Sequence, residues 1–143
     1  MKQAQDYLNS KEIHFSQQRI AIMDYLMKHR THPTVDEIYL ALSPQMPTLS
    51  RTTVYNTLKL FAEQDAILTI NIDEKNARFD ACTSPHAHFF CTQCGTIYDI
   101  PLPEEVEQEQ SQPCNNPNLK EFTVKSTQLY YKGICPLCKT SEK

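Results

Sequence analysis

The chain has 143 residues, which suffice for one ordinary domain or for two small ones. Its 40% hydrophobic and 22% charged residues are typical of a globular protein, and aliphatic stretches such as residues 20–23 are far shorter than the roughly 20 residues of a membrane span. The net charge of −3 argues against a uniformly basic nucleic-acid-binding protein. The N-terminus turns acidic at Asp6 where a signal peptide needs an apolar core, so we expect a cytoplasmic protein. In that compartment six cysteines favour metal binding over disulfides.

The first half of the chain predicts three helices followed by a β-hairpin. Apolar residues recur there at helical spacing in three blocks, each preceded by a residue that can cap a helix N-terminus. The expected caps are Ser16, Thr34 and Ser50, and the expected helices cover about residues 17–28, 35–43 and 51–64. The apolar period then changes to two over residues 68–72 and 77–81. Three helices and a hairpin describe a winged helix-turn-helix, whose third helix enters the DNA major groove.

The third expected helix has one polar face and one apolar face. At about 100° per residue, Val54, Thr57 and Phe61 lie opposite an arc of cationic, amide and hydroxyl side chains. The members of that arc are Arg51, Thr52, Tyr55, Asn56 and Lys59. Residues 38–62 contain no acid, which leaves a local positive potential. The pattern favours a DNA-reading surface, and in a dimer two such helices would read a two-fold symmetric operator; an ordinary polar helix face is the alternative.

Beyond Pro85 the sequence changes character. Strands are expected near residues 86–91, 96–100 and 122–131, with an acidic helix near 103–110. We place a hinge at 83–85, which gives domains of residues 1–83 and 84–143. A domain of about 60 residues has little core of its own and needs a staple or a partner.

Two Cys-x-x-Cys motifs supply a candidate staple. Cys91, Cys94, Cys135 and Cys138 can place four thiolates in a tetrahedron, as in a structural zinc site. The two glycines of the chain, Gly95 and Gly133, adjoin these motifs, where backbone must turn. Two unrelated buried cysteine pairs are the alternative. Cys82 and Cys114 lie outside the pattern and are most simply small hydrophobic residues.

Histidines and aspartates form a second candidate metal site. Side chains alternate along a strand, so His86 and His88 share one face. If residues 91 and 96 pair across a hairpin, Asp99 stands opposite His88 on that face. Asp80, and His32 held extended by Pro33, are further candidates. This nitrogen and oxygen set suits Fe(II), Mn(II) or Zn(II), while surface or hydrogen-bonded histidines are the alternative.

The motifs together resemble those of the ferric-uptake-regulator family, over nearly the whole chain and in the right order. They are Gln18-Arg19, His32-Pro33-Thr34, Thr53-Val54-Tyr55, Arg78-Phe79-Asp80, His86-x-His88-x-x-Cys91-x-x-Cys94-Gly95 and Gly133-x-Cys135-x-x-Cys138. The resemblance implies a homodimeric, metal-dependent transcriptional repressor and no enzyme. It implies an α+β fold, with an N-terminal winged helix-turn-helix DNA-binding domain and a small C-terminal α/β dimerisation domain stapled by zinc. Asn56 and Asp99 are most similar to the peroxide-sensing branch, since iron-uptake regulators usually carry arginine and glutamate there.

The resemblance also implies a role for each site residue. The implied ligands of the structural zinc are Cys91, Cys94, Cys135 and Cys138. The implied ligands of the regulatory Fe(II) or Mn(II) are His32, Asp80, His86, His88 and Asp99. The implied DNA contacts are Arg19, Ser50, Arg51, Thr52, Thr53, Tyr55, Asn56 and Lys59. In the peroxide-sensing mechanism a ligand imidazole is oxidised, with His32 and His86 as candidates, and the DNA is released.

Other functions stay open on the sequence. If Cys82 replaced Asp80 as a ligand, the softer sulfur would favour zinc and remove peroxide chemistry. An iron- or zinc-responsive repressor of metal-uptake genes is the main alternative. A metalloenzyme whose His-x-His site activates water, and a zinc-stapled protein-interaction module, are alternatives from other classes.

Overall fold

The computed structural model describes residues 1–71, 76–82, 86–104, 116–124 and 127–141. The chain forms two compact units, Met1–Thr83 and Ser84–Lys143. Within the described ranges, no helix combines the length and the apolar character needed to cross a membrane.

The first unit is a bundle of helices joined to a short hairpin. Its helices are α1 (Lys2–Ser10), α2 (Gln17–Lys28), α3 (Val35–Leu42) and α4 (Arg51–Glu63). The three expected N-caps are confirmed: the hydroxyls of Ser16, Thr34 and Ser50 each accept a backbone N–H three residues ahead, at 3.1–3.2 Å. These bonds satisfy donors that have no partner inside the helix, and so they define where each helix begins.

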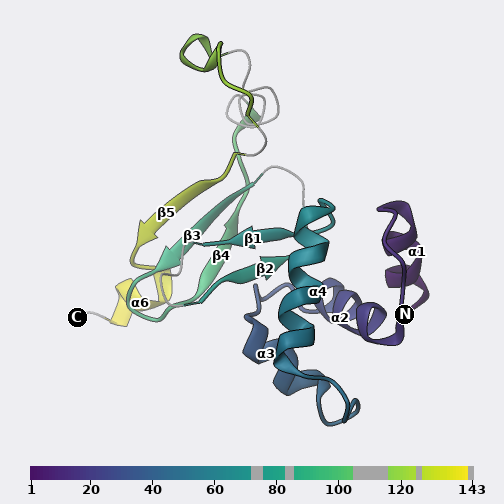
Figure 1. Cartoon of the computed structure of the whole chain (residues 1–143). Coiled ribbons are helices and arrows are strands. Elements are labelled where there is room, and N and C mark those ends of the chain that lie inside the picture. The colour runs from purple at the N-terminus through teal and green to yellow at the C-terminus, as the bar shows by residue number, and fades with distance from the viewer. Residues whose placement is uncertain (72–75, 83–85, 105–115, 125–126, 142–143) are drawn as a thin grey trace. The chain divides into compact units, whose positions relative to one another are not determined.

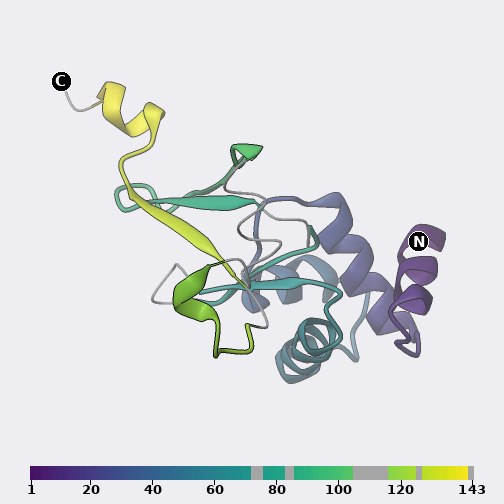
Figure 2. The same ribbon diagram turned by 90° about the horizontal axis from the view of Figure 1, so that it is seen from above.

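Helix α1 was not expected from the sequence. Its apolar face is narrow, because Ala4 and Leu8 are its only buried residues, spaced by one helical turn. The helix packs against α2, as Figure 2 shows for the deep purple segment beside the N-terminus. Packing against a neighbour therefore stabilises a segment whose own periodic signal is weak.

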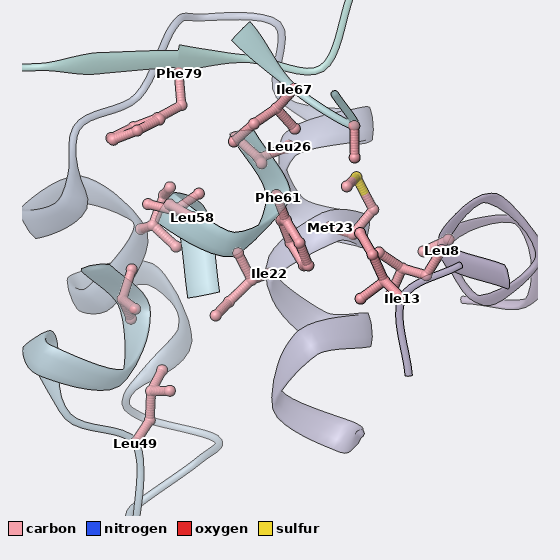
Figure 3. Packing of buried hydrophobic residues seen from close by; sticks show 14 residues of the cluster. Leu8, Ile13, Ile22, Met23, Leu26, Leu49, Leu58, Phe61, Ile67 and Phe79 are labelled. Carbon is pink, nitrogen blue, oxygen red and sulfur yellow. The ribbon is translucent and has the colours of Figure 1, made fainter. Parts of the chain in front are cut away.

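The hairpin follows α4 and closes the core of the first unit. Strands β1 (Leu68–Ile70) and β2 (Arg78–Asp80) pair antiparallel, with Leu68 opposite Asp80. The core gathers around Phe61, which reaches from α4 between Ile22 and Met23 of α2 (Figure 3). Val54, Thr57 and Phe61 are buried, which confirms the expected core face of α4. The opposite face of α4 is thereby directed to solvent.

The second unit is built on a three-stranded sheet. Its strands are β3 (Ala87–Cys91), β4 (Ile97–Ile100) and β5 (Leu129–Gly133). The central strand β3 pairs antiparallel with β4 and parallel with β5 (Figure 1). His88 lies opposite Asp99, and the backbone N–H of Cys91 donates to the carbonyl of Thr96 at 3.0 Å. The expected hairpin register is therefore confirmed.

Other expectations for the second half need correction. The strand expected from Phe122 begins only at Leu129, because Phe122 lies in a bend after the 3₁₀ turn η2 (Pro117–Leu119). An unexpected helix, α6 (Pro136–Ser141), follows β5. Most of the expected acidic helix at 103–110 falls outside the described residues, as does Cys114.

Candidate functional site

Four thiols converge at one end of the sheet of the second unit. Cys91 ends β3, Cys94 lies in the turn toward β4, and Cys135 and Cys138 stand just before and within α6. All four Sγ atoms lie within 4.8 Å of one another, and those of Cys94 and Cys135 are 3.8 Å apart. Sulfurs that share a tetrahedral zinc ion at about 2.3 Å are about 3.8 Å apart. The donor set and its spacing fit zinc, and no disulfide joins the described cysteines.

Backbone N–H groups favour the thiolate form of Cys91. The amides of Cys94 and Cys135 each point at Cys91 Sγ at 3.4 Å. Hydrogen bonding from the Cys94 amide lowers the pKa of the Cys91 thiol to about 6, against the opposing effect of burial. A ligand that is already ionised near neutral pH can bind a cation without first losing a proton.

Tyr98 is a neighbour of the thiols that sequence reasoning missed. Its hydroxyl donates to Cys135, which lowers the pKa of that thiol and raises the pKa of Tyr98 to about 12. Cys138 in turn hydrogen-bonds to Cys135, and this raises the pKa of Cys138 to about 12. Tyr98 lies opposite Phe89 in the sheet, two residues along β3 from Cys91, so strand alternation puts it on the face that carries Cys91. The register together with the Cys-x-x-Cys motif could have pointed to it.

The two glycines beside the thiols have different roles. Gly95 has a φ of +77°, a left-handed conformation that side chains disfavour, and its N–H donates to the carbonyl of Cys91 at 2.8 Å. Gly133 ends β5, where it pairs with Cys91 and is packed against Phe89. The turn at Gly95 therefore depends on glycine, because its φ is positive. Gly133 instead ends a strand, and its backbone does not adopt a positive φ.

The second unit also brings two imidazoles to one carboxylate. His86 Nε2 and His88 Nε2 lie 3.2 and 3.4 Å from the same oxygen, Oδ1 of Asp99. The two rings meet edge to face, with centroids 4.4 Å apart. Donors that share an ion at roughly 2.1 Å stand about 3.0–3.5 Å apart, so these three residues could bind one divalent ion.

A second pair of candidate ligands lies in the first unit. His32 Nε2 is 3.5 Å from Asp80 Oδ2, and both side chains are buried. The other carboxylate oxygen of Asp80 accepts the N–H of Cys82 at 2.9 Å and lies 3.6 Å from the guanidinium of Arg30. Cys82 thus contributes its backbone to the orientation of Asp80.

The backbone of His32 differs from the expected extended form. Its φ is +57°, in the left-handed region that few residues other than glycine adopt. Long-range hydrogen bonds support this conformation: Arg78 donates to the His32 carbonyl at 3.2 Å, and the N–H of Phe79 donates to the carbonyl of Pro33 at 3.1 Å. Contacts with β2 therefore overcome the local preference set by Pro33.

The candidate DNA-reading residues fall into two groups. Arg51, Thr52, Tyr55, Asn56 and Lys59 are exposed on α4. The other three are engaged locally: the hydroxyls of Ser50 and Thr53 lie 2.9 Å apart at the helix cap, and Arg19 donates to the carbonyl of His14 at 2.7 Å. Residues 38–62 contain no acidic residue, but Asp36 lies beside this segment in the structure and accepts a hydrogen bond from Arg51 at 2.9 Å.

Comparison with known proteins agrees with this arrangement. The ferric uptake regulator family model matches residues 10–132. The peroxide operon regulator of Bacillus subtilis is 35% identical over 99% of this chain and 95% of its own. The solved PerR of Streptococcus pyogenes, described for peroxide sensing and gene regulation, is 27% identical with a TM-score of 0.51, over 95% of this chain and 90% of that one. The Helicobacter pylori ferric uptake regulator Fur is 20% identical with a TM-score of 0.73, over 99% and 93%, which supports the fold. The chain belongs to the ferric uptake regulator family.

Proposed function

We propose that this protein is a homodimeric, metal-dependent transcriptional repressor that senses hydrogen peroxide. The 35% identity to a peroxide operon regulator, over nearly the full length of both chains, carries the proposal. The exposed polar face of α4 supports DNA binding, because its amide, hydroxyl and cationic groups can contact base edges and phosphates.

The four thiols would hold a structural zinc ion. Support comes from their spacing and from the backbone hydrogen bonds to Cys91. The ion would tie the turn after β3 to the start of α6, two segments separated by 40 residues of chain between Cys94 and Cys135. Zinc would then maintain the sheet that contains His88 and that His86 directly precedes.

The regulatory ion would take ligands from both units. His32 and Asp80 are held together in the first unit, and His86, His88 and Asp99 in the second. Each group alone offers too few donors for a six-coordinate Fe(II) or Mn(II) ion, so full coordination would favour one relative arrangement of the two units. Metal occupancy would in this way shift the population toward the DNA-binding dimer.

Peroxide sensing would depend on the loss of one ligand. Bound Fe(II) would supply the electrons that reduce hydrogen peroxide close to the ligand imidazoles, and His32 and His86 are the candidates for oxidation. An imidazole that has gained oxygen is a poorer donor, so the link between the units would weaken and the operator would be released. The protein is consumed in the process, which distinguishes a sacrificial sensor from an enzyme.

DNA binding is tested by a mobility-shift assay on promoter fragments, with Mn(II) or with a chelator that spares the structural zinc. We expect a Mn(II)-dependent shift that Asp99→Ala abolishes while zinc content and dimer are retained. A Cys82→Ser variant is the control and should keep its Mn(II)-dependent shift. Loss of the shift in this variant would show that the regulatory site uses the Cys82 sulfur instead. Absence of any shift at saturating Mn(II) would leave a zinc-stapled interaction module as the better assignment.

Peroxide sensing is tested by mass spectrometry of Fe(II)-loaded protein before and after stoichiometric peroxide, with Mn(II)-loaded protein as control. Trypsin releases residues 31–51, which contain His32 and Met46, and residues 79–120, which contain His86 and His88. Fragment ions must therefore separate a histidine that gains oxygen from methionine sulfoxide and oxidised cysteine. Oxygen on His32 or His86 with iron only, together with loss of the shift, is the expected result.

Unmodified histidines with operator binding intact would favour the alternative of an iron- or zinc-responsive repressor. A hydrolytic enzyme would instead show a turnover that depends on His86 and survives further purification.

A further inference from the structure

The first residue of α4 is held on two sides by α3. Arg51 Nε donates to Asp36 Oδ1 at 2.9 Å, and its guanidinium carbon lies 4.3 Å from the centre of the Tyr39 ring. Asp36 and Tyr39 are three residues apart on α3, so they share one face of that helix. The two contacts restrict the guanidinium plane in orthogonal directions, one within the plane and one against its face.

The restraint leaves the outer edge of the guanidinium available. Within the described part of the chain, no hydrogen bond is made by the two terminal amino groups of Arg51, and the side chain is 57% exposed. These amino groups form the fork that matches two adjacent acceptors. A fork fixed in advance loses less conformational freedom on binding than a mobile side chain does.

The position of Arg51 favours a base over a phosphate as the acceptor pair. Residues at the N-terminus of a recognition helix contact base edges in the major groove, and the O6 and N7 atoms of guanine form the acceptor pair that arginine reads most often. The carboxylate of Asp36 is 67% exposed and would oppose a contact that served only to attract phosphates. A carboxylate beside Arg51 therefore favours orientation of the guanidinium over attraction to phosphates.

We propose that Arg51 reads a guanine in the operator and that Asp36 and Tyr39 are positioning residues which hold its fork in register. This inference rests on the proposed DNA-binding function and adds a specificity residue to it. Asp36 acts through Arg51, so its removal should impair discrimination between sequences without weakening general attraction to DNA.

The test uses full-length, zinc-containing protein loaded with Mn(II), and an operator obtained by selection from a random duplex pool. Dissociation constants are measured for the selected duplex and for a scrambled one, at two salt concentrations. Arg51→Ala should lower the specific-to-nonspecific ratio by about 5- to 150-fold, the range for one bidentate contact. Asp36→Ala removes the acceptor and should lower the ratio by about fivefold or more, with nonspecific binding unchanged or tighter.

Two comparisons separate positioning from a general structural effect. In the Arg51→Ala background, Asp36→Ala should leave the ratio unchanged, because there is no fork left to orient. Glu63→Ala removes an acidic side chain from the opposite end of α4 and should leave the ratio as in the wild type. Arg51→Lys keeps the charge but not the fork, so it should lower the ratio and preserve the salt dependence.

The outcomes that overturn the inference differ from those that overturn the proposed function. If the wild-type protein selects no sequence, both fail. If the wild type discriminates but Asp36→Ala has no effect, or has the same effect with and without Arg51, the inference fails and the proposed function stands. A uniform loss of affinity for both duplexes in Arg51→Ala would identify a phosphate contact and also overturn it.

Discussion

Removal of the proposed structural zinc should unfold the second unit and leave the first folded. The first unit buries many large side chains, among them Phe61, Leu58 and Ile22. In the described part of the second unit, the buried hydrophobic residues are Ala87, Ile97 and two of the four clustered cysteines, Cys91 and Cys135. The thiol cluster is thus a large share of what this unit buries.

The expected loss of stability follows from the few side chains that the second unit buries. Burial of one large aliphatic side chain contributes about 1.5–3 kcal/mol. A cross-link that closes a loop of about 40 residues contributes about 4 kcal/mol through loss of chain entropy in the unfolded state. A structural zinc site contributes about 10–16 kcal/mol at neutral pH, which equals or exceeds the whole stability of a typical domain. The second unit should therefore not stay folded without the ion.

Hydrogen exchange measured by mass spectrometry tests whether the second unit unfolds without zinc. Exchange is compared before and after treatment with a strong chelator and a thiol reductant, and zinc content is measured in parallel. Amides of β3 and β5 should lose their protection, and amides of α2 and α4 should keep theirs. Cys135→Ser should behave like the chelated protein, whereas Cys82→Ser should retain zinc and protection.

The reasoning would be refuted by zinc-free protein in which β3 and β5 exchange within tenfold of their original rates. Simultaneous loss of protection in α2 and α4 would also contradict it, because the first unit has an apolar core of its own.

Three further predictions concern single residues. Tyr98→Phe removes the hydroxyl that donates to Cys135 and should lower zinc affinity by about 10- to 100-fold in chelator competition, and unchanged affinity would show that this hydrogen bond does not support the site. Gly95→Ala should lower the free energy of unfolding by about 1–2 kcal/mol, because Gly95 has a φ of +77°. Gly133→Ala should be close to neutral, because an added Cβ would only make van der Waals contact with Phe89 at 3.4 Å. Equal losses of stability in the two variants would contradict this reasoning. Ser50→Ala removes the N-cap of α4 and should cost about 1 kcal/mol in thermal unfolding, and a neutral result would exclude this cap as a determinant of the helix start.

Expectations based on short-range patterns agreed with the structure most closely. The N-caps at Ser16, Thr34 and Ser50, and the pairing of His88 with Asp99, depend on residues close together in sequence. Helix and strand periods repeat within a few residues, so such patterns can be read without knowledge of the rest of the fold. Helix α1 was missed because its apolar face holds only two buried residues and depends on its contact with α2.

Short-range patterns were therefore enough to predict helices α2, α3 and α4, the Cys-x-x-Cys turns and the common side on which His86 and His88 lie, but not helices α1 and α6. Contacts between distant side chains were not predictable in this way: Tyr98 reaches Cys135, Arg78 supports the left-handed backbone of His32, and Asp36 accepts a hydrogen bond from Arg51. Local backbone geometry limits each residue to a few conformations whatever surrounds it. Contacts between residues 15 to 46 positions apart, by contrast, exist only after packing has brought their elements together, and no short window of sequence contains that information.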